Sequence, residues 1–230
     1  MEHHEMFSVF AKCFGAVSED EWRAVTSKAL WSDFIDAVRS ALQDDRPLGS
    51  QEARFVRRRG FCPLQEFLSE GEVSALFCPP TYQEKRDFAA RHFTGGLPGS
   101  AVPIESLYAA GSSRAGDGYL RSEGAYLGDS ARYMRELVAR LGLEIPEEYS
   151  ACPDHLALEL DLTAVLLRGG MRHQALTFVR ERFAWLESYR QQLLKIDDDD
   201  ASFYIGLVDA VMGIWLKNLV SEGETIGALD

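Results

Sequence analysis

Cysteine is scarce in this 230-residue sequence, and the few cysteines present do not follow a metal-binding spacing. No C-x-x-C pair occurs, which argues against a zinc ribbon or an iron–sulfur site. Widely separated cysteines are typical of reduced thiols in a cytosolic protein. We therefore interpret all four as structural or incidental: Cys13, Cys62, Cys78 and Cys152.

Long apolar runs are missing as well. No stretch approaches the roughly 18 residues needed to cross a bilayer. The N-terminus, MEHHEMFSVFAKCFGAV, has no basic region and carries charged residues early, so it does not resemble a secretory signal. We expect a cytoplasmic protein with no stable membrane insertion.

Positive charge is in deficit, with 24 Lys and Arg against 36 Asp and Glu and a net charge of −12. Nucleic-acid binding needs a positive surface, so no nucleic-acid partner is expected. An acidic surface favours cationic partners such as an arginine-bearing peptide, although solubility alone would also explain it. The run of four aspartates at 197–200 has the same two interpretations, a solvated loop or an attraction for a cationic peptide.

Strand signals are nearly absent, whereas apolar residues recur at helical spacing along most of the chain. Ser18 and Glu21 form a predicted capping box at the start of a helical pattern that continues to Leu42. Before it, a short first helix has an apolar face made of Met6, Phe10 and Cys13. Further helical patterns cover residues 50–73 (in two pieces), 80–93, 126–142, 154–167, 171–196 and 201–220.

These patterns predict an all-α fold, a single compact helical domain of about ten helices over residues 1–230. Residues 95–122 interrupt the helical pattern and are rich in Gly, Ser and Pro. Because the segment is too long for a simple connector, it is a functional loop or a hinge. A hinge would divide the domain into an N-terminal lobe of about 1–120 and a C-terminal lobe of about 123–225.

The stretch EEYSACPDHLALELDLTAVLL, residues 147–167, places an Asp-His pair between a proline and an apolar helix. Adjacent residues on a helix point about 100° apart, so Asp154 and His155 do not form a direct catalytic dyad. His155 and Glu159 are four apart and share a helix face, a spacing that can hold a metal. The Glu-x-x-His pattern of di-iron bundles is nevertheless absent, so neither catalysis nor a metal is expected.

A simple structural role also fits this stretch. Cys152 would lie near the N-cap, Pro153 at the first helical position, and Asp154 in the first turn, where the helix dipole favours an acidic residue. The following helix is apolar nearly all round, which would hold its N-terminus rigidly enough to support a binding site. Capping and binding are compatible, and both interpretations remain open.

Three elements of the sequence together resemble a known family. CPDHLALEL, residues 152–160, resembles the Pro-x-Asp-His signature of the TorD/DmsD/NarJ group of cytosolic chaperones for molybdenum enzymes. VPIESLYAAG, residues 102–111, resembles that family's P-x-x-S-x-Y loop, matching at Pro103, Ser106 and Tyr108. The last two helical patterns are similar to the family's final helices, with Trp185 and the pair Phe203-Tyr204 in their expected places.

The resemblance implies an all-helical fold with no catalytic activity and no cofactor. Family members bind the N-terminal segment, often a twin-arginine signal peptide, of a molybdopterin-dependent oxidoreductase catalytic subunit. They assist cofactor insertion and delay export of that subunit. The alternative function is a helical metal-binding or small-molecule-binding protein outside this family. Both a monomer and a domain-swapped dimer are open, since the helical pattern breaks at 95–122 and again at 146–153, and both breaks are potential swap hinges.

Carried over to this sequence, the resemblance implies a peptide-binding site built from the two motifs. Carboxylates such as Asp154, with Glu105 and Glu159 as helpers, would meet the arginines of the peptide, since guanidinium groups favour planar carboxylate partners. His155 would orient the loop or contact the peptide backbone. The expected site residues are Asp154, His155, Pro153, Glu159, Pro103, Glu105, Ser106 and Tyr108.

Overall fold

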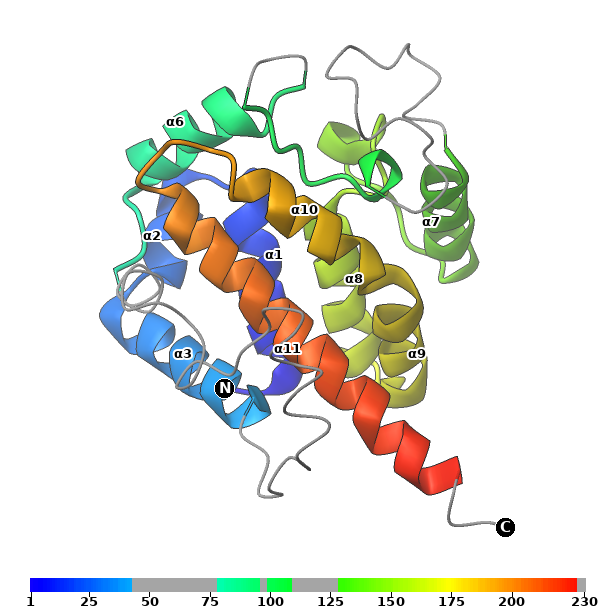
Figure 1. Ribbon diagram of the computed structural model, residues 1–230. Coiled ribbons are helices and arrows are strands. Elements are labelled where there is room, and N and C mark those ends of the chain that lie inside the picture. Colours follow the sequence, from blue (N-terminus) through cyan, green and yellow to red (C-terminus); the bar gives the residue numbers. More distant parts are fainter. Residues whose placement is uncertain (43–77, 96–98, 109–127, 227–230) are drawn as a thin grey trace.

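The computed structural model describes residues 1–42, 78–95, 99–108 and 128–226, with only the backbone described for 215–226 (Figure 1). Within these ranges the chain forms α-helices and short 3-10 helices and no strand, so the predicted all-α fold is confirmed. The helical pieces expected at 50–73 lie outside the described residues. The α-helices are α1 (His3–Phe14), α2 (Glu19–Val25), α3 (Lys28–Leu42), α6 (Tyr82–His92), α7 (Asp129–Arg140), α8 (Leu156–Arg168), α9 (Arg172–Arg182), α10 (Leu186–Leu193) and α11 (Ala201–Ile226). The 3-10 helices are η1 (Glu105–Leu107), η3 (Glu147–Tyr149) and η4 (Phe183–Trp185).

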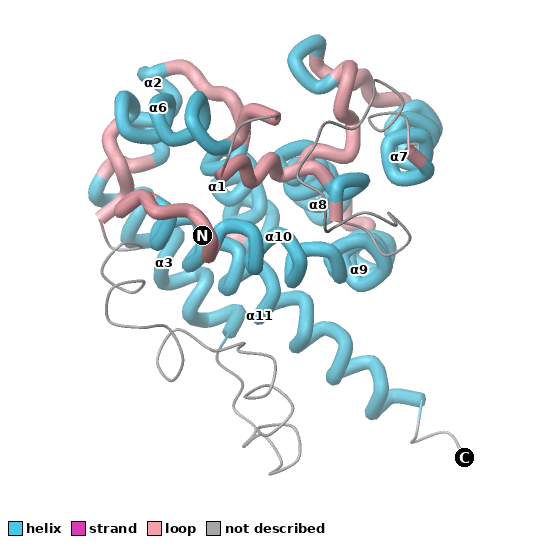
Figure 2. Tube along the Cα trace, turned by 45° about the horizontal axis from the view of Figure 1, so that its top comes forward, coloured by secondary structure: helices cyan, strands magenta, loops and turns pink. Residues whose placement is uncertain are grey.

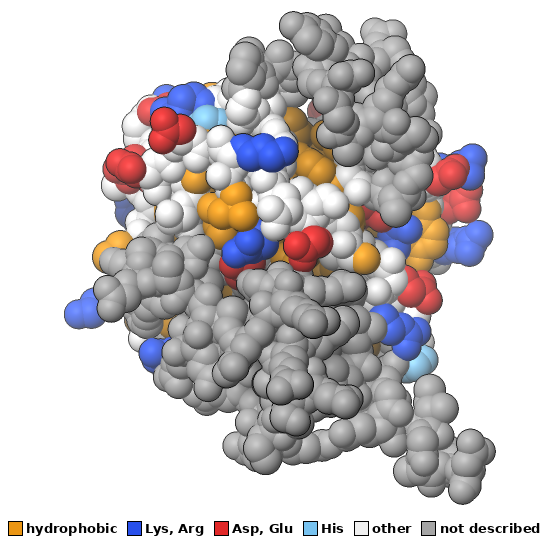
Figure 3. Space-filling model, in the orientation of Figure 1, with side chains coloured by type: hydrophobic (Ala, Val, Ile, Leu, Met, Phe, Trp, Pro, Cys, Tyr) orange, Lys and Arg blue, Asp and Glu red, His pale blue; other side chains and the backbone are white. Residues whose placement is uncertain are grey.

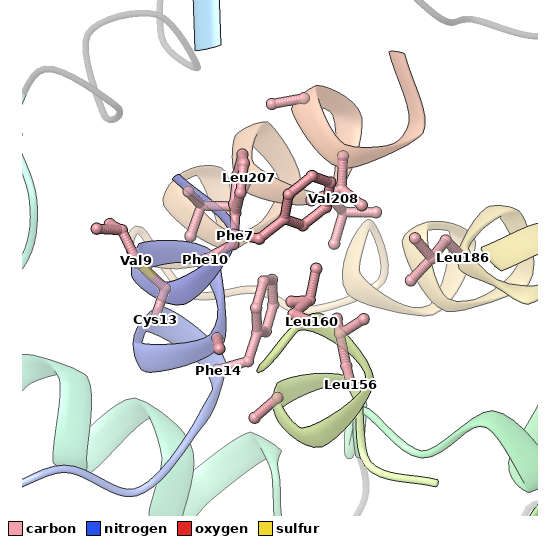
Figure 4. Close-up of a cluster of buried hydrophobic side chains, with 14 of the residues drawn as sticks. Phe7, Val9, Phe10, Cys13, Phe14, Leu156, Leu160, Leu186, Leu207 and Val208 are labelled. Atoms are coloured by element: carbon pink, nitrogen blue, oxygen red, sulfur yellow. The ribbon is translucent and has the colours of Figure 1, made fainter. Parts of the chain in front are cut away.

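The core forms where α1 packs along α8, with α10 and α11 against them (Figures 1 and 2). Phe10 and Phe14 of α1 approach Leu160 of α8 in the centre of this packing, as Figure 4 shows. The predicted apolar face of the first helix is confirmed as buried, because Phe10 and Cys13 have no exposed surface. Since burial of one phenylalanine contributes about 1.5–3 kcal/mol, the packing of Phe10 and Phe14 in the core is a major source of stability.

The helical pattern beginning at Ser18 divides into α2 and α3. The predicted capping box is present: Ser18 Oγ accepts from the Glu21 backbone N–H at 3.3 Å, and Ser18 N–H donates to the Glu21 carboxylate at 3.0 Å. The pattern stops at Thr26, whose hydroxyl donates to the carbonyl oxygen of Trp22 at 2.8 Å. Hydroxyl groups that bond back to the preceding turn often bend helices. The chain then restarts as α3, which carries Trp31 against Phe203 of α11.

The helical pattern at 171–196 also divides, into α9, η4 and α10. A 3-10 turn is tighter than an α-helical turn, so it changes the direction in which the following side chains point. Here it buries both Phe183 and Trp185. The spacing of apolar residues in the sequence does not reveal the 3-10 turn, because apolar residues continue through η4 without a break.

The elements of the expected N- and C-terminal lobes pack against each other. α1 lies on α8, and α3 lies on α11. The lobe boundary and the hinge remain predictions. None of the helices in the described ranges combines the length and the hydropathy that a bilayer span requires.

Candidate functional site

The two sequence motifs meet in the structure. The segment at 101–107 runs across the N-terminus of α8, next to residues 154–156. The Glu105 N–H donates to the Asp154 carbonyl at 3.0 Å, and the Leu156 N–H donates to the Pro103 carbonyl at 2.9 Å. These bonds form an isolated antiparallel bridge between the two segments. The motifs, about fifty residues apart in the sequence, therefore form one structural unit, which we call the motif junction (residues 103–108 and 153–156).

Asp154 anchors the motif junction from inside. Its side chain has no exposed surface, and its Oδ2 accepts a hydrogen bond from the Ser106 N–H at 2.9 Å. Oδ1 of the same carboxylate has no partner among the described residues. A buried carboxylate that accepts a backbone N–H fixes the turn that supplies it, so Asp154 holds the segment at 103–108 on α8.

His155, rather than Cys152, is the N-cap of α8, so the helix starts three residues later than the predicted N-cap. Asp154 therefore precedes the helix instead of lying in its first turn. The Nδ1 of His155 accepts a hydrogen bond from the Ala157 N–H at 3.1 Å. The sequence suggested Cys152 because proline usually follows the N-cap directly. Here Pro153 and Asp154 instead form a turn, closed by a hydrogen bond from the His155 N–H to the Cys152 carbonyl at 3.1 Å, and the backbone bonds to 103–105 follow it.

The His155 imidazole is neutral in the folded protein. Burial, together with a smaller contribution from the nearby Lys85 ammonium, lowers the pKa of His155 to about 4. A neutral ring matches the cap geometry, because Nδ1 must be unprotonated to accept from Ala157. The ring also lies 5.0 Å from the Tyr149 ring, between centroids. His155 retains some exposed surface.

Two glutamates lie in the same buried region. Glu159 of α8 has no exposed surface, and its Oε2 accepts from the Trp185 Nε1–H at 3.3 Å. Burial raises the pKa of Glu159 well above its usual value, and the neighbouring Glu105 raises it further. Burial also raises the pKa of Glu105, although Arg182 opposes that rise. At least one of the two carboxyls therefore holds its proton at pH values where exposed glutamates are ionised.

Arg182, at the end of α9, supplies the positive charge in this region. Its Nη2 donates to Oε2 of Glu105, and its guanidinium carbon lies 4.7 Å from the centroid of the Tyr133 ring. The sequence analysis did not identify Arg182. The available signal was Glu159 itself, since a carboxylate in an otherwise apolar helix requires a cationic or donor partner.

Tyr108 lies at the outer end of the motif junction and is partly buried. Its ring stacks on Trp185 with centroids 5.7 Å apart and an interplanar angle of 14°. The Tyr189 ring is 5.5 Å from it. Trp185 therefore links the aromatic and acidic parts of the site, because it contacts Tyr108 and also donates to Glu159.

The structure thus brings the eight predicted residues into one region, but with different exposure. Tyr108 and His155 retain accessible surface. The other six are buried: Pro103, Glu105, Ser106, Pro153, Asp154 and Glu159. Buried residues position their neighbours and set the local charge, whereas direct contact with a partner requires accessible atoms.

The aspartate run lies at the other end of α10, in the loop before α11. Asp198 Oδ2 accepts from Arg91 Nη2 at 2.6 Å and lies 3.1 Å from Nε2 of His92. Asp197–Asp200 line a shallow hollow with Glu84. In the described part of the face seen in Figure 3, acidic and basic side chains lie close together instead of forming one acidic patch. Among the described residues, no group of three or more His, Cys, Asp or Glu is arranged to hold a metal ion.

Comparison with known proteins gives one match. The family described as nitrate reductase delta subunit matches residues 80–195, which is half of the chain and includes the motif junction, Arg182 and Trp185. No curated protein and no solved structure matched the chain. The chain therefore belongs to the nitrate reductase delta subunit family, the NarJ/TorD-type chaperones of molybdoenzyme maturation.

Proposed function

We propose that this protein is a cytoplasmic chaperone that binds the N-terminal signal segment of a molybdopterin-dependent oxidoreductase catalytic subunit. In this role it assists cofactor insertion and delays export of the client. It carries out no catalysis and needs no cofactor of its own. The observation that carries the proposal is the family match, because it spans both segments of the motif junction.

Direct contact with the peptide is assigned to the accessible residues of the site. Tyr108 offers an aromatic ring already stacked on Trp185, and His155 offers a neutral imidazole. Aromatic rings with a polar tip are common at protein interfaces because they provide contact area at low entropic cost.

The buried predicted residues act from behind this surface. Asp154 and Ser106 hold the motif junction together through the hydrogen bond between carboxylate and backbone. Glu105, which Arg182 holds, and Glu159, which accepts from Trp185, keep the neighbouring side chains in place. The net charge of −12 adds a long-range attraction that accelerates the encounter with a cationic peptide.

The test measures binding of a synthetic peptide that carries two adjacent arginines followed by an apolar stretch. The affinity of wild type is compared with those of Tyr108→Ala, His155→Asn and Asp154→Asn. We expect Tyr108→Ala to weaken binding by about tenfold, a typical effect for an aromatic interface residue. Tyr82→Ala is the matched control, because Tyr82 is also partly buried but lies on α6, away from the motif junction.

Unchanged affinity in Tyr108→Ala, His155→Asn and Asp154→Asn, with circular dichroism confirming that each is folded, would refute the assignment of the site. Equal losses in Tyr82→Ala and Tyr108→Ala would also refute it. Failure of wild type to bind any such peptide would refute the signal-segment function itself.

A further inference from the structure

Arg182 is held in the way that proteins hold a guanidinium ligand. Its Nη2 donates to the Glu105 carboxylate, and its guanidinium carbon lies 4.7 Å from the centroid of the Tyr133 ring. A planar cation between a carboxylate and an aromatic face satisfies both the charge and the flat surface of the guanidinium group.

The hydrogen bonding of Arg182 to its neighbours is incomplete. Nε of Arg182 is buried and has no hydrogen-bond partner among the described residues. A guanidinium that engages a carboxylate with two parallel N–H groups gains strength and geometry that a single bond lacks. A buried donor without a partner is unfavourable, because it has lost its hydrogen bond to water and gained none in the protein. Arg182 therefore binds Glu105 less well than a freely placed guanidinium would.

Among the described residues, Arg182 is the more exposed member of its pair with Glu105. The Arg182 side chain is 18% exposed and the Glu105 side chain 6% exposed, so the guanidinium covers the carboxylate from outside. Tyr133 of α7 is 39% exposed. Displacement of the Arg182 side chain leaves both the Glu105 carboxylate and the Tyr133 ring without their cation.

The surrounding residues offer more acceptors than Arg182 uses. Three buried carboxyl groups, those of Glu105, Glu159 and Asp154, gather near one guanidinium. Oδ1 of Asp154 has no hydrogen-bond partner among the described residues, whereas the Glu159 carboxyl pairs with that of Glu105. A guanidinium has five N–H donors, so a second arginine has acceptors available that Arg182 leaves unused.

We propose that Tyr133 and Glu105 form a guanidinium-binding site, that Arg182 occupies it as an internal ligand, and that an arginine of the client segment replaces Arg182. The identity of the incoming arginine rests on the proposed function, whereas the site and its internal ligand do not. Exchange of one guanidinium for another leaves Glu105 paired in both the free and the bound protein, so the complex does not contain a buried carboxylate without a partner.

The first test removes the internal ligand and supplies a small one. In Arg182→Ala, millimolar ethylguanidinium should bind saturably and raise the melting temperature by several degrees, because it restores the cation beside Glu105. Ethylammonium has the same charge but lacks the planar set of N–H donors of a guanidinium, so it should raise the melting temperature less. Arg180→Ala, which removes a neighbouring arginine of α9, is the matched control and should show no saturable response.

Arg182→Lys keeps a cation and serves as the variant if Arg182→Ala does not fold. It should also respond to ethylguanidinium more strongly than wild type does. Adding Tyr133→Leu to either variant should weaken ethylguanidinium binding. No saturable response to ethylguanidinium in the folded Arg182 variants would overturn the proposal.

The second test measures exchange with a peptide. We expect the folded Arg182 variant to bind the two-arginine peptide about tenfold more tightly than wild type, because no internal guanidinium competes. A peptide with lysines in place of both arginines should show no such gain. Equal or weaker affinity of the variant for the arginine peptide would overturn the exchange. If no form of the protein binds either peptide but ethylguanidinium still binds, the signal-segment function fails and the guanidinium site stands.

Discussion

Replacing Glu159 by glutamine tests whether the buried cluster holds an extra proton. Burial and the neighbouring Glu105 raise the pKa of Glu159 well above its usual 4.5. Above pH 4.5 the carboxyl therefore ionises in the unfolded chain before it ionises in the folded protein. This difference favours the unfolded state increasingly as the pH rises, until the folded carboxyl ionises as well.

The size of the effect has a ceiling. Each pH unit above 4.5 lowers the free energy of unfolding by about 1.4 kcal/mol, so the largest loss at pH 7 is about 3 kcal/mol. Glutamine matches the protonated carboxyl in shape, can accept from Trp185 Nε1–H and can donate to Glu105, and it does not titrate. We expect the stability of Glu159→Gln relative to wild type to increase by about 1–3 kcal/mol between pH 4.5 and pH 7.

The assay is urea unfolding at several pH values, followed by tryptophan fluorescence and extrapolated linearly to water. Glu136→Gln is the matched control, because the Glu136 side chain on α7 is 57% exposed, and its stability difference should be nearly independent of pH. A relative stability of Glu159→Gln that stays constant or falls between pH 4.5 and pH 7 would refute the reasoning. It would mean that Glu159 is ionised in the folded protein and that Arg182 compensates it.

Three further predictions concern local contacts. Because the pKa of His155 is lowered to about 4, the unfolded chain takes up a proton between about pH 6.5 and 4 that the folded protein excludes, so stability falls as the pH falls through this range. His155→Asn keeps a cap acceptor and does not titrate, so its free energy of unfolding in urea should fall less between pH 6.5 and 4 than that of wild type, by up to about 3 kcal/mol. An equal fall in the two proteins would contradict this. Gly15→Ala places its Cβ 2.6 Å from the Tyr149 hydroxyl oxygen and should cost about 1–3 kcal/mol in thermal unfolding. Adding Tyr149→Phe should recover part of that loss, and no recovery would mean that the hydroxyl is not the obstacle. Ser18→Ala removes the acceptor for the Glu21 N–H and should cost about 1 kcal/mol in the same assay, whereas wild-type stability would show that the cap is dispensable.

Local signals in the sequence predicted the helices well. The apolar face of α1 and the capping box of α2 depend on residues three or four positions apart, so one short window contains all the information. The two motifs on which the site is built are local in the same sense. Their recognition therefore did not require any knowledge of the tertiary structure.

Features that depend on distant residues were missed. The N-cap of α8 lies at His155 because the backbone at 103–105 bonds to residues 154–156, a contact across about fifty residues. Arg182 was not identified because helical spacing does not indicate which of 24 Lys and Arg residues pairs with a buried glutamate. The breaks at Thr26 and at η4 follow from side-chain hydrogen bonding and burial that the apolar pattern does not record.

The packing of α1 on α8 has a consequence for the order of folding. α1 precedes its main partner by about 140 residues, and α10 and α11 follow later still. At a synthesis rate of about 5–20 residues per second, α1 waits on the order of ten seconds or more for these partners. During that time α3 already offers Phe34 to Phe10, but Phe14 lacks its partners Tyr189 and Tyr204, so part of the aromatic face of α1 stays exposed and prone to aggregation. The order of the helices along the chain therefore delays full burial of the aromatic face of α1 until most of the protein has been made.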